Sequence, residues 1–209
     1  MQIVARQLMT LYPTPLFTGR IADLSLCDRL ETACRAMRSA KEGVIEETFF
    51  MSHDNIQTRS DMKELVDLVL KESDDILNFL KVKRHAHYIT NMWANITDPN
   101  HRQALHIHPN CLLSGIVYVR APKNCGMTTF ADPRPGARML EPTYTEMTPI
   151  NMGTYAIAPE KGVFLIWPSW LPHAVERGSA APNEERIVIA FNIMMRGTIT
   201  TPTAYLELK

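Results

Sequence analysis

The chain has 209 residues, 45% of them hydrophobic, and its 22 basic and 22 acidic side chains balance to a formal net charge of zero. This length suits one domain with a sizeable core, and the balanced charge argues against a nucleic-acid or membrane-surface partner. No apolar run reaches the roughly 18 residues that cross a bilayer, and the N-terminus lacks the apolar segment of a signal peptide. We therefore expect a cytoplasmic protein whose cysteines, none of them in a CxxC pair, stay reduced.

The first 83 residues are predicted to be mostly helical. One helix is expected to begin at Ser25 and to end near Gly43, because apolar residues recur at helical spacing between Leu26 and Met37. A second helix is expected from Ser60 to about Leu80 on the same grounds. This part of the chain would therefore form a helical buttress.

From residue 84 onward the pattern changes to short β-rich runs separated by Pro, Gly and Asn, which is typical of strands joined by turns. The expected strands cover residues 85–96, 105–108, 112–119, 127–130, 155–158, 162–167, 173–176, 186–194 and 204–208. Helices followed by strands predict a mainly β fold with N-terminal helices. We expect a single domain, residues 1–209, in which residues 1–83 support an antiparallel sandwich or barrel formed by residues 84–209.

Three histidines in the β-rich part have the pattern of a metal site. His106 and His108 are two residues apart, so in an extended strand both imidazoles point to the same face. His173 follows later, in an apolar stretch flanked by prolines. Three ligands from separate strands would leave a mononuclear metal with open positions, as in catalytic sites.

The segments around these histidines resemble a known family. They are residues 106–110 (HIHPN), 113–119 (LSGIVYV) and 167–175 (WPSWLPHAV), with residues 11–17 (LYPTPLF) similar to the family's start. Together they resemble the small 2OG-Fe(II) oxygenases found in phages and bacteria, within the Fe(II)/2-oxoglutarate-dependent dioxygenases. The resemblance implies a double-stranded β-helix (jelly-roll) core, Fe(II) held by His106, His108 and His173, 2-oxoglutarate as co-substrate, and hydroxylation of a substrate C–H bond.

The same resemblance implies a binding site for the co-substrate. Arg186 opens a strand after His173, at the place where these enzymes use a planar, two-pronged guanidinium to bind the C5 carboxylate of 2-oxoglutarate. The alternative is an edge-strand arginine paired with Glu184 or Glu185. Tyr118 could donate its hydroxyl to the same carboxylate or line the pocket, and the alternative is a core aromatic.

Further residues are candidates for the surroundings of the metal or for substrate binding. Asn95, Asn110 and Asn192 are polar groups in or beside apolar strands, and each needs a hydrogen-bond partner if buried. Asn110 continues the two-residue spacing of the histidine pair, and Trp93 has the same spacing from Asn95. Trp167 lies near the distal histidine. Structural hydrogen bonding for the asparagines, and a core or pocket-wall position for Trp167, are the simpler readings.

One position departs from the resembled pattern, because His108 stands where the usual triad has Asp or Glu. A neutral imidazole does not offset the charge of the metal as a carboxylate would, and imidazole suits Fe, Zn, Cu and Ni alike. One rival function is therefore a three-histidine, cupin-type dioxygenase that uses no 2-oxoglutarate. Another is a non-enzymatic jelly-roll, such as a phage structural or assembly protein.

Two further features bear on the site and its substrate. His85 and His87 form a second HxH pair, but they follow a basic stretch and have no downstream partner, so we expect no metal there. The stretch from Pro133 to Gly153 has little regular pattern and a length typical of a lid over a pocket. We expect a small-molecule or peptide substrate, and a homodimer is also compatible with the sequence.

Overall fold

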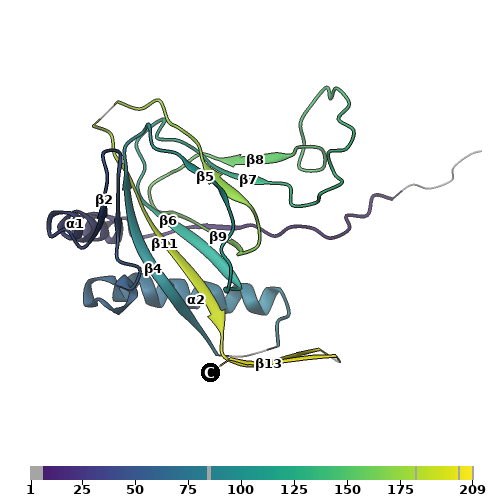
Figure 1. Ribbon diagram of the computed structural model, residues 1–209, viewed down its shortest axis with the longest axis horizontal. Helices are drawn as coiled ribbons and strands as arrows, with labels where there is room; N and C mark the ends of the chain where they lie inside the picture. Colours follow the sequence, from purple (N-terminus) through teal and green to yellow (C-terminus); the bar gives the residue numbers. More distant parts are fainter. Residues whose placement is uncertain (1–6, 84–85, 182, 202, 209) are drawn as a thin grey trace, which may run out of the picture.

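The mainly β fold with N-terminal helices is confirmed by a computed structural model that describes residues 7–83, 86–181, 183–201 and 203–208 (Figure 1). In chain order the elements are β1 (Phe17–Arg20), α1 (Ser25–Ser39), β2 (Gly43–Ile45), β3 (Phe49–Ser52), the 3-10 turns η1 (Ile56–Thr58) and η2 (Ser60–Met62), α2 (Lys63–Phe79), β4 (His87–Thr97), β5 (Gln103–His106), β6 (Leu113–Arg120), β7 (Thr128–Ala131), β8 (Thr154–Ile157), β9 (Val163–Pro168), β10 (His173–Val175), β11 (Arg186–Met195), β12 (Gly197–Thr201) and β13 (Ala204–Leu208).

Two antiparallel sheets form the body of the protein. The major sheet has the strand order β1-β9-β6-β11-β4-β3-β2, and the minor sheet has the order β5-β10-β7-β8. β12 and β13 pair with each other as a separate hairpin, which projects from the body beside the end of β11 (Figure 1). The strand connections cross between the two large sheets, as in a jelly-roll.

The alternation of side chains along β11 separates two apolar cores. Ile187, Ile189, Phe191 and Ile193 face one way and pack with buried residues of α1 and α2, such as Leu30 and Leu65. Val188 and Ala190 face the other way and pack with Tyr118, Phe130 and Trp167, inside the jelly-roll. The helices therefore cover the outer face of the major sheet, and the minor sheet covers its inner face. The facing sides of the two sheets, together called the inner face of the jelly-roll from here on, carry most of the predicted site residues.

Most of the expected elements are present, with small shifts in their bounds. α1 begins at Ser25 as predicted but ends at Ser39, and the second helical segment begins with the 3-10 turn η2 at Ser60 before α2. The N-terminal region is less helical than predicted, because β1, β2 and β3 also come from it and extend the major sheet. β1 pairs with β9, so Phe17 lies opposite Ile166, a residue far away in sequence.

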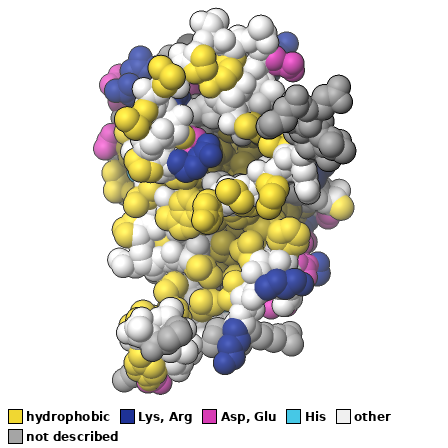
Figure 2. All heavy atoms as spheres, turned by 90° about the vertical axis from the view of Figure 1, so that its right-hand side faces the viewer, with side chains coloured by type: hydrophobic (Ala, Val, Ile, Leu, Met, Phe, Trp, Pro, Cys, Tyr) yellow, Lys and Arg dark blue, Asp and Glu magenta, His cyan; other side chains and the backbone are white. Residues whose placement is uncertain are grey.

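Hydrophobic side chains gather on the face from which the β7–β8 connection and the hairpin project (Figure 2). Exposed apolar residues of the described N-terminal segment, the β7–β8 connection and the hairpin include Tyr12, Met139, Leu140 and Tyr205.

Among the described residues, no helix is long and apolar enough to cross a membrane.

Candidate metal centre

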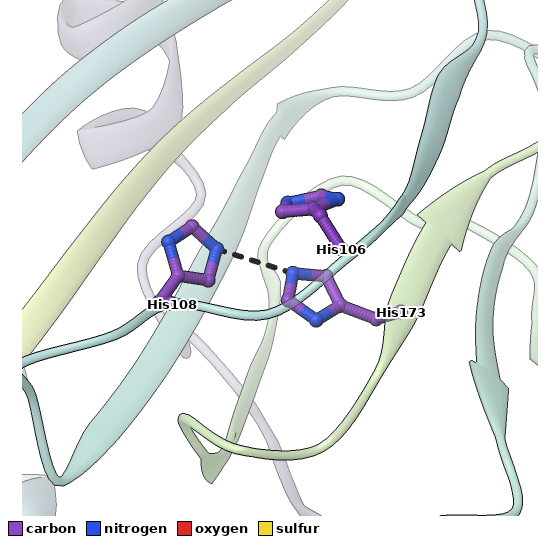
Figure 3. A group of neighbouring side chains, drawn as sticks. All are labelled: His106, His108 and His173. Atoms are coloured by element: carbon purple, nitrogen blue, oxygen red, sulfur yellow. Dashed lines mark hydrogen bonds between the residues drawn. The ribbon is translucent and has the colours of Figure 1, made fainter.

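His106, His108 and His173 come together at one end of the minor sheet. His106 ends β5 and lies directly opposite His173, the first residue of β10. His108 follows two residues after β5, where its backbone N–H donates to the carbonyl of Ser169 at 3.0 Å. One ring nitrogen of each histidine lies within 4.8 Å of the others. Figure 3 shows the three rings turned toward a common point.

Backbone hydrogen bonds fix which nitrogen of two rings is available. His106 Nδ1 lies 2.8 Å from the carbonyl oxygen of Ala104, and His173 Nδ1 lies 2.9 Å from that of Leu171. A carbonyl can only accept, so each Nδ1 carries the proton and each Nε2 keeps a free lone pair. This is the arrangement in which a histidine ligand donates its second N–H to the protein.

The centre favours neutral imidazoles. Burial, with smaller contributions from the neighbouring histidines, lowers the pKa of His108 and of His173 to about 4. His108 Nε2 and His173 Nε2 lie 3.2 Å apart and share a hydrogen bond (Figure 3), and removal of the shared proton would leave a lone pair on each nitrogen for one metal ion. Neutral rings with converging lone pairs are what a transition metal requires.

Aromatic side chains enclose the histidines. Trp93 on β4 has its ring centroid 5.9 Å from that of His108. Trp167 on β9 packs edge-on against His173 at 4.7 Å, and Phe130 on β7 lies against Trp167. The Trp167 side chain is buried, and its indole Nε1 finds no hydrogen-bond partner among the described residues. A buried N–H without a partner is costly, so the centre has a donor that a ligand could use.

Arg186 forms a second polar group on the same inner face. It is only 3% exposed, and its Nη2 donates to Thr128 Oγ1 at 3.3 Å while Nε has no partner among the described residues. The Tyr118 hydroxyl donates to the same Thr128 oxygen at 2.7 Å. Burial raises the pKa of Tyr118, although Arg186 opposes that shift, so the phenol stays a donor. Thr128 accepts twice, which leaves its own hydrogen for a ligand.

The nearby carboxylates that could neutralise Arg186 are engaged elsewhere. Glu185 pairs with Arg35 and Arg38 of α1, and Glu184 pairs with Arg120 at 3.0 Å. The alternative reading of Arg186, an arginine paired with Glu184 or Glu185, is therefore wrong. No carboxylate of the described residues forms an ion pair with Arg186. A buried, unpaired guanidinium implies an anionic ligand.

The histidine cluster and Thr128, which contacts Arg186, lie at neighbouring levels of the minor sheet. Thr128 and Phe130 are two residues apart on β7, and Phe130 is the residue paired with His173 on β10. Two residues of a strand span roughly 7 Å, so Thr128, which contacts Arg186, lies about the length of a small dicarboxylate along β7 from the level of His173. Thr128, the first residue of β7, was not among the predicted site residues.

Asn192 belongs to a hydrogen-bond network between strands. Its Oδ1 accepts from Ser114 Oγ at 2.7 Å, and its Nδ2 donates to Asn91 Oδ1 at 3.0 Å. Ser114 Oγ also lies 2.8 Å from Ser169 Oγ, next to the carbonyl that holds His108. The network joins β4, β6 and β11 to the turn beneath the metal centre, which is the structural hydrogen bonding weighed from the sequence.

The remaining predicted residues are less directly involved. Asn95 is half-buried on β4, two residues from Trp93, with no side-chain hydrogen bond to a described residue. Asn110 lies in an exposed turn with φ of 62°, so strand spacing does not apply to it and the same-face expectation is wrong. His87 binds the carbonyl of Leu70 at 3.0 Å, whereas His85 lies outside the described residues.

The donor set and the unpaired groups fit Fe(II) with 2-oxoglutarate. Three neutral imidazole nitrogens converge on one point. The buried Arg186 and the hydroxyls of Tyr118 and Thr128 could bind a carboxylate, and Trp167 has a further buried N–H donor. Buried apolar side chains of the inner core, such as Ile116 and Leu165, pack in the same interior, which suits the carbon chain of a small dicarboxylate.

The fold is shared with solved 2-oxoglutarate enzymes. One is a prolyl-4-hydroxylase from Pseudomonas putida, with 12% identity, a TM-score of 0.62, and 86% of this chain and 92% of that chain covered. A viral collagen prolyl hydroxylase from Paramecium Bursaria Chlorella virus-1 has 16% identity, a TM-score of 0.55, and coverage of 85% and 94%. HygX from Streptomyces hygroscopicus, with nickel, 2-oxoglutarate and hygromycin B bound, has 9% identity, a TM-score of 0.57, and coverage of 87% and 83%.

At these low identities the structural matches show the shared fold alone, and the family has to be judged from the sequence. A search of curated protein sequences found no match. Residues 91–192 match the family model described as "Putative 2OG-Fe(II) oxygenase", and this segment contains all three histidines and Arg186. Over this segment, slightly less than half of the chain, the sequence therefore matches the 2OG-Fe(II) oxygenase family.

Proposed function

We propose that this protein uses Fe(II) and 2-oxoglutarate to hydroxylate a C–H bond of a small-molecule or peptide substrate. His106, His108 and His173 would hold the metal through their Nε2 atoms. The metal, once bound with its co-substrate, supplies activation of molecular oxygen. The protein's own groups bind and orient the co-substrate and keep water out of the centre.

The residues of the inner face would have different roles in binding and orienting the co-substrate. Arg186 and the hydroxyls of Tyr118 and Thr128 would bind the C5 carboxylate of 2-oxoglutarate. Trp167 would donate its indole N–H to a ligand oxygen beside His173, and Trp93 would form the wall next to His108. The Asn192 network would hold the His108 turn in place through Ser169. Asn95 and Asn110 lie further out, where they would be available to a substrate.

One observation carries the proposal: Arg186 is a buried cation with no carboxylate partner among the described residues, on the same inner face as three converging histidines. A structural metal site alone would not require it. A charged group in this position destabilises the empty protein unless an anion compensates it. A dicarboxylate that also reaches the metal satisfies both requirements.

The direct test is calorimetry of 2-oxoglutarate binding to the Mn(II)-loaded protein under nitrogen. Arg186→Lys keeps the charge but loses the two-pronged geometry, so the affinity for 2-oxoglutarate should fall by roughly 10- to 100-fold while Mn(II) affinity stays unchanged. Arg120→Lys is the matched control, because Arg120 pairs with Glu184 at the surface. Equal affinities in all three proteins would place the carboxylate site elsewhere.

Product analysis separates the proposal from its rivals. Turnover should convert 2-oxoglutarate to succinate and CO2, even slowly and without the true substrate. Absence of 2-oxoglutarate binding, together with oxygen consumption on some other substrate, would favour the three-histidine dioxygenase. A protein that binds neither metal nor 2-oxoglutarate would favour the non-enzymatic jelly-roll.

The connection between β7 and β8 would shape the substrate pocket. Asp132, just after β7, donates its N–H to Gly153 just before β8, which closes the base of this long connection. Tyr155 pairs with Phe130, so it shares the face of the metal centre, and it is about half exposed. The apolar face in Figure 2 would suit an apolar substrate segment or, in the homodimer compatible with the sequence, a second copy of the chain.

A further inference from the structure

The inner face of the jelly-roll carries positive charge without a compensating carboxylate. The group of side chains that could hold a metal consists of three histidines, and no Asp or Glu of the described residues belongs to it. Arg186 adds a full positive charge nearby, while Glu184 and Glu185 are held by Arg120, Arg35 and Arg38. A divalent metal would therefore enter an environment that is already cationic.

The lack of a negatively charged ligand lowers the affinity of the site for a metal ion when 2-oxoglutarate is not bound. The affinity of a metal site depends on how many negative charges its ligands bring, and three neutral imidazoles bring none. The half-buried to buried position of the histidines makes the uncompensated charge more costly than it would be in water. Imidazole coordination has to offset this repulsion without help from the protein's acidic groups.

A 2-oxoglutarate dianion would compensate both positive charges, that of Arg186 and that of the metal ion. One carboxylate would meet Arg186, and the other, with the 2-oxo group, would reach the metal at the level of His173. The co-substrate thus supplies the negative charge that the three histidine ligands do not bring. Linkage requires the effect to be reciprocal, so bound metal must strengthen 2-oxoglutarate binding by the same factor.

We propose that metal and 2-oxoglutarate bind to this protein with strong positive cooperativity, because the co-substrate replaces the anionic ligand that His108 does not provide. Each binds weakly alone, and the pair binds tightly. This inference rests on the proposed function, and it concerns the order and strength of binding, not the reaction.

The test measures Mn(II) affinity without and with saturating 2-oxoglutarate, by electron paramagnetic resonance of free Mn(II) under nitrogen. In the wild type, 2-oxoglutarate should tighten Mn(II) binding by about 100-fold or more, near the upper end of typical coupling between two sites. His108→Asp places a carboxylate on the metal, so Mn(II) should bind more tightly alone and the gain from 2-oxoglutarate should fall to about 10-fold or less.

His108→Asn is the matched control, because Asn has the shape of Asp without its charge. It should keep a gain at least as large as that of the wild type, although its Mn(II) affinity is lower. His108→Glu and His108→Gln repeat the comparison with a longer side chain, in case the shorter ones do not reach the metal. Circular dichroism checks that each variant is folded.

Two results would overturn the inference: a wild-type gain below about 5-fold, the lower end of typical coupling, or equal gains in the charged and neutral variants. Failure of the proposed function looks different, because 2-oxoglutarate would then give no heat even with protein saturated by Mn(II).

Discussion

Each histidine of the centre contributes a single ring nitrogen, so the loss of one ring leaves only two donors for the metal. His106 and His173 are also fixed by backbone carbonyls, which makes them the better-oriented pair. Two imidazoles from opposite strands cannot by themselves hold a divalent ion tightly in a site without carboxylates.

His106→Ala and His173→Ala should therefore abolish the stoichiometric Fe(II) binding that the wild type shows with saturating 2-oxoglutarate, measured by metal analysis after anaerobic gel filtration in that co-substrate, with the fold intact by circular dichroism. His53→Ala is the control, because His53 is exposed and belongs to no metal-binding group of the described residues. One tightly bound metal per chain in both variants would show that the site is elsewhere.

Trp167 offers the next test at the scale of single residues. Trp167→Phe keeps an aromatic ring beside His173 but removes the unpartnered N–H. If that N–H donates to a carboxylate oxygen of the co-substrate, 2-oxoglutarate affinity should fall by about 10-fold, as expected for one hydrogen bond to a charged group. Calorimetry on the Mn(II)-loaded protein measures the change, with the half-exposed Trp170→Phe as control. Unchanged affinity would leave Trp167 as pocket wall only.

At the scale of elements, the packing between β6, β9 and β11 depends on a residue without a side chain. A Cβ on Gly115 of β6 would lie 2.4 Å from the Phe191 ring and 2.7 Å from the backbone oxygen of Leu165. The ring could move, but the strand oxygen could do so only by distorting the sheet. Gly115 thus allows these strands to pack closely behind the metal centre.

Gly115→Ala should lower the free energy of unfolding by about 1–3 kcal/mol, the usual effect of overpacking a core. Urea denaturation followed by tryptophan fluorescence gives the value. Gly136→Ala should have almost no effect, because a Cβ added at Gly136 would meet no heavy atom of the described residues within 4 Å. Equal stabilities of the two variants would mean that the sheets relax freely around the added methyl group.

Local chemistry explains which strands could be predicted. Runs bounded by Pro, Gly and Asn, such as β6 and β11, were found close to their true bounds because turn residues mark their ends. β1 is only four residues long and forms by pairing with the distant strand β9, as Phe17 does with Ile166. Nothing in a four-residue segment specifies a partner so far along the chain.

The same distinction applies to the site. The two-residue spacing placed His106 and His108 on one side correctly, although His108 lies just outside β5. The spacing failed one step later at Asn110, where the backbone turns into the left-handed region. The partners of Asn192 and Arg186, among them Ser114 and Thr128, could not be predicted because they come from other strands.

At the scale of the whole molecule, Glu185 ties the helical layer to the start of β11. Glu185 directly precedes Arg186 in the chain, and its carboxylate accepts hydrogen bonds from Arg35 and Arg38 of α1. Burial alone would raise the pKa of Glu185, but the hydrogen bonds and charges of the two arginines together lower it below its usual value. The folded protein therefore binds the proton less readily than the unfolded chain.

Glu185→Gln should lower stability by about 1 kcal/mol at neutral pH, as expected for a partly exposed network of charges. The wild-type advantage is fully present above the unfolded-state pKa of about 4.3 and is lost as pH falls through the lower folded-state pKa. Urea denaturation at pH 7 and pH 3 measures both ends. Glu184→Gln, at the more exposed pair, is the control. A difference as large at pH 3 as at pH 7 would show that charge is not its cause.

The three neutral imidazole nitrogens of the centre also determine which metal ions compete for this site inside a cell. Without a carboxylate, the ligand set gives no preference for a hard ion, and nitrogen donors follow the Irving–Williams order, in which Ni(II), Cu(II) and Zn(II) bind more tightly than Fe(II). Correct loading would then depend on metal availability during synthesis. Protein recovered from nickel-affinity resin, or from zinc-rich medium, would carry the wrong ion and appear inactive until it was stripped and reloaded with ferrous iron.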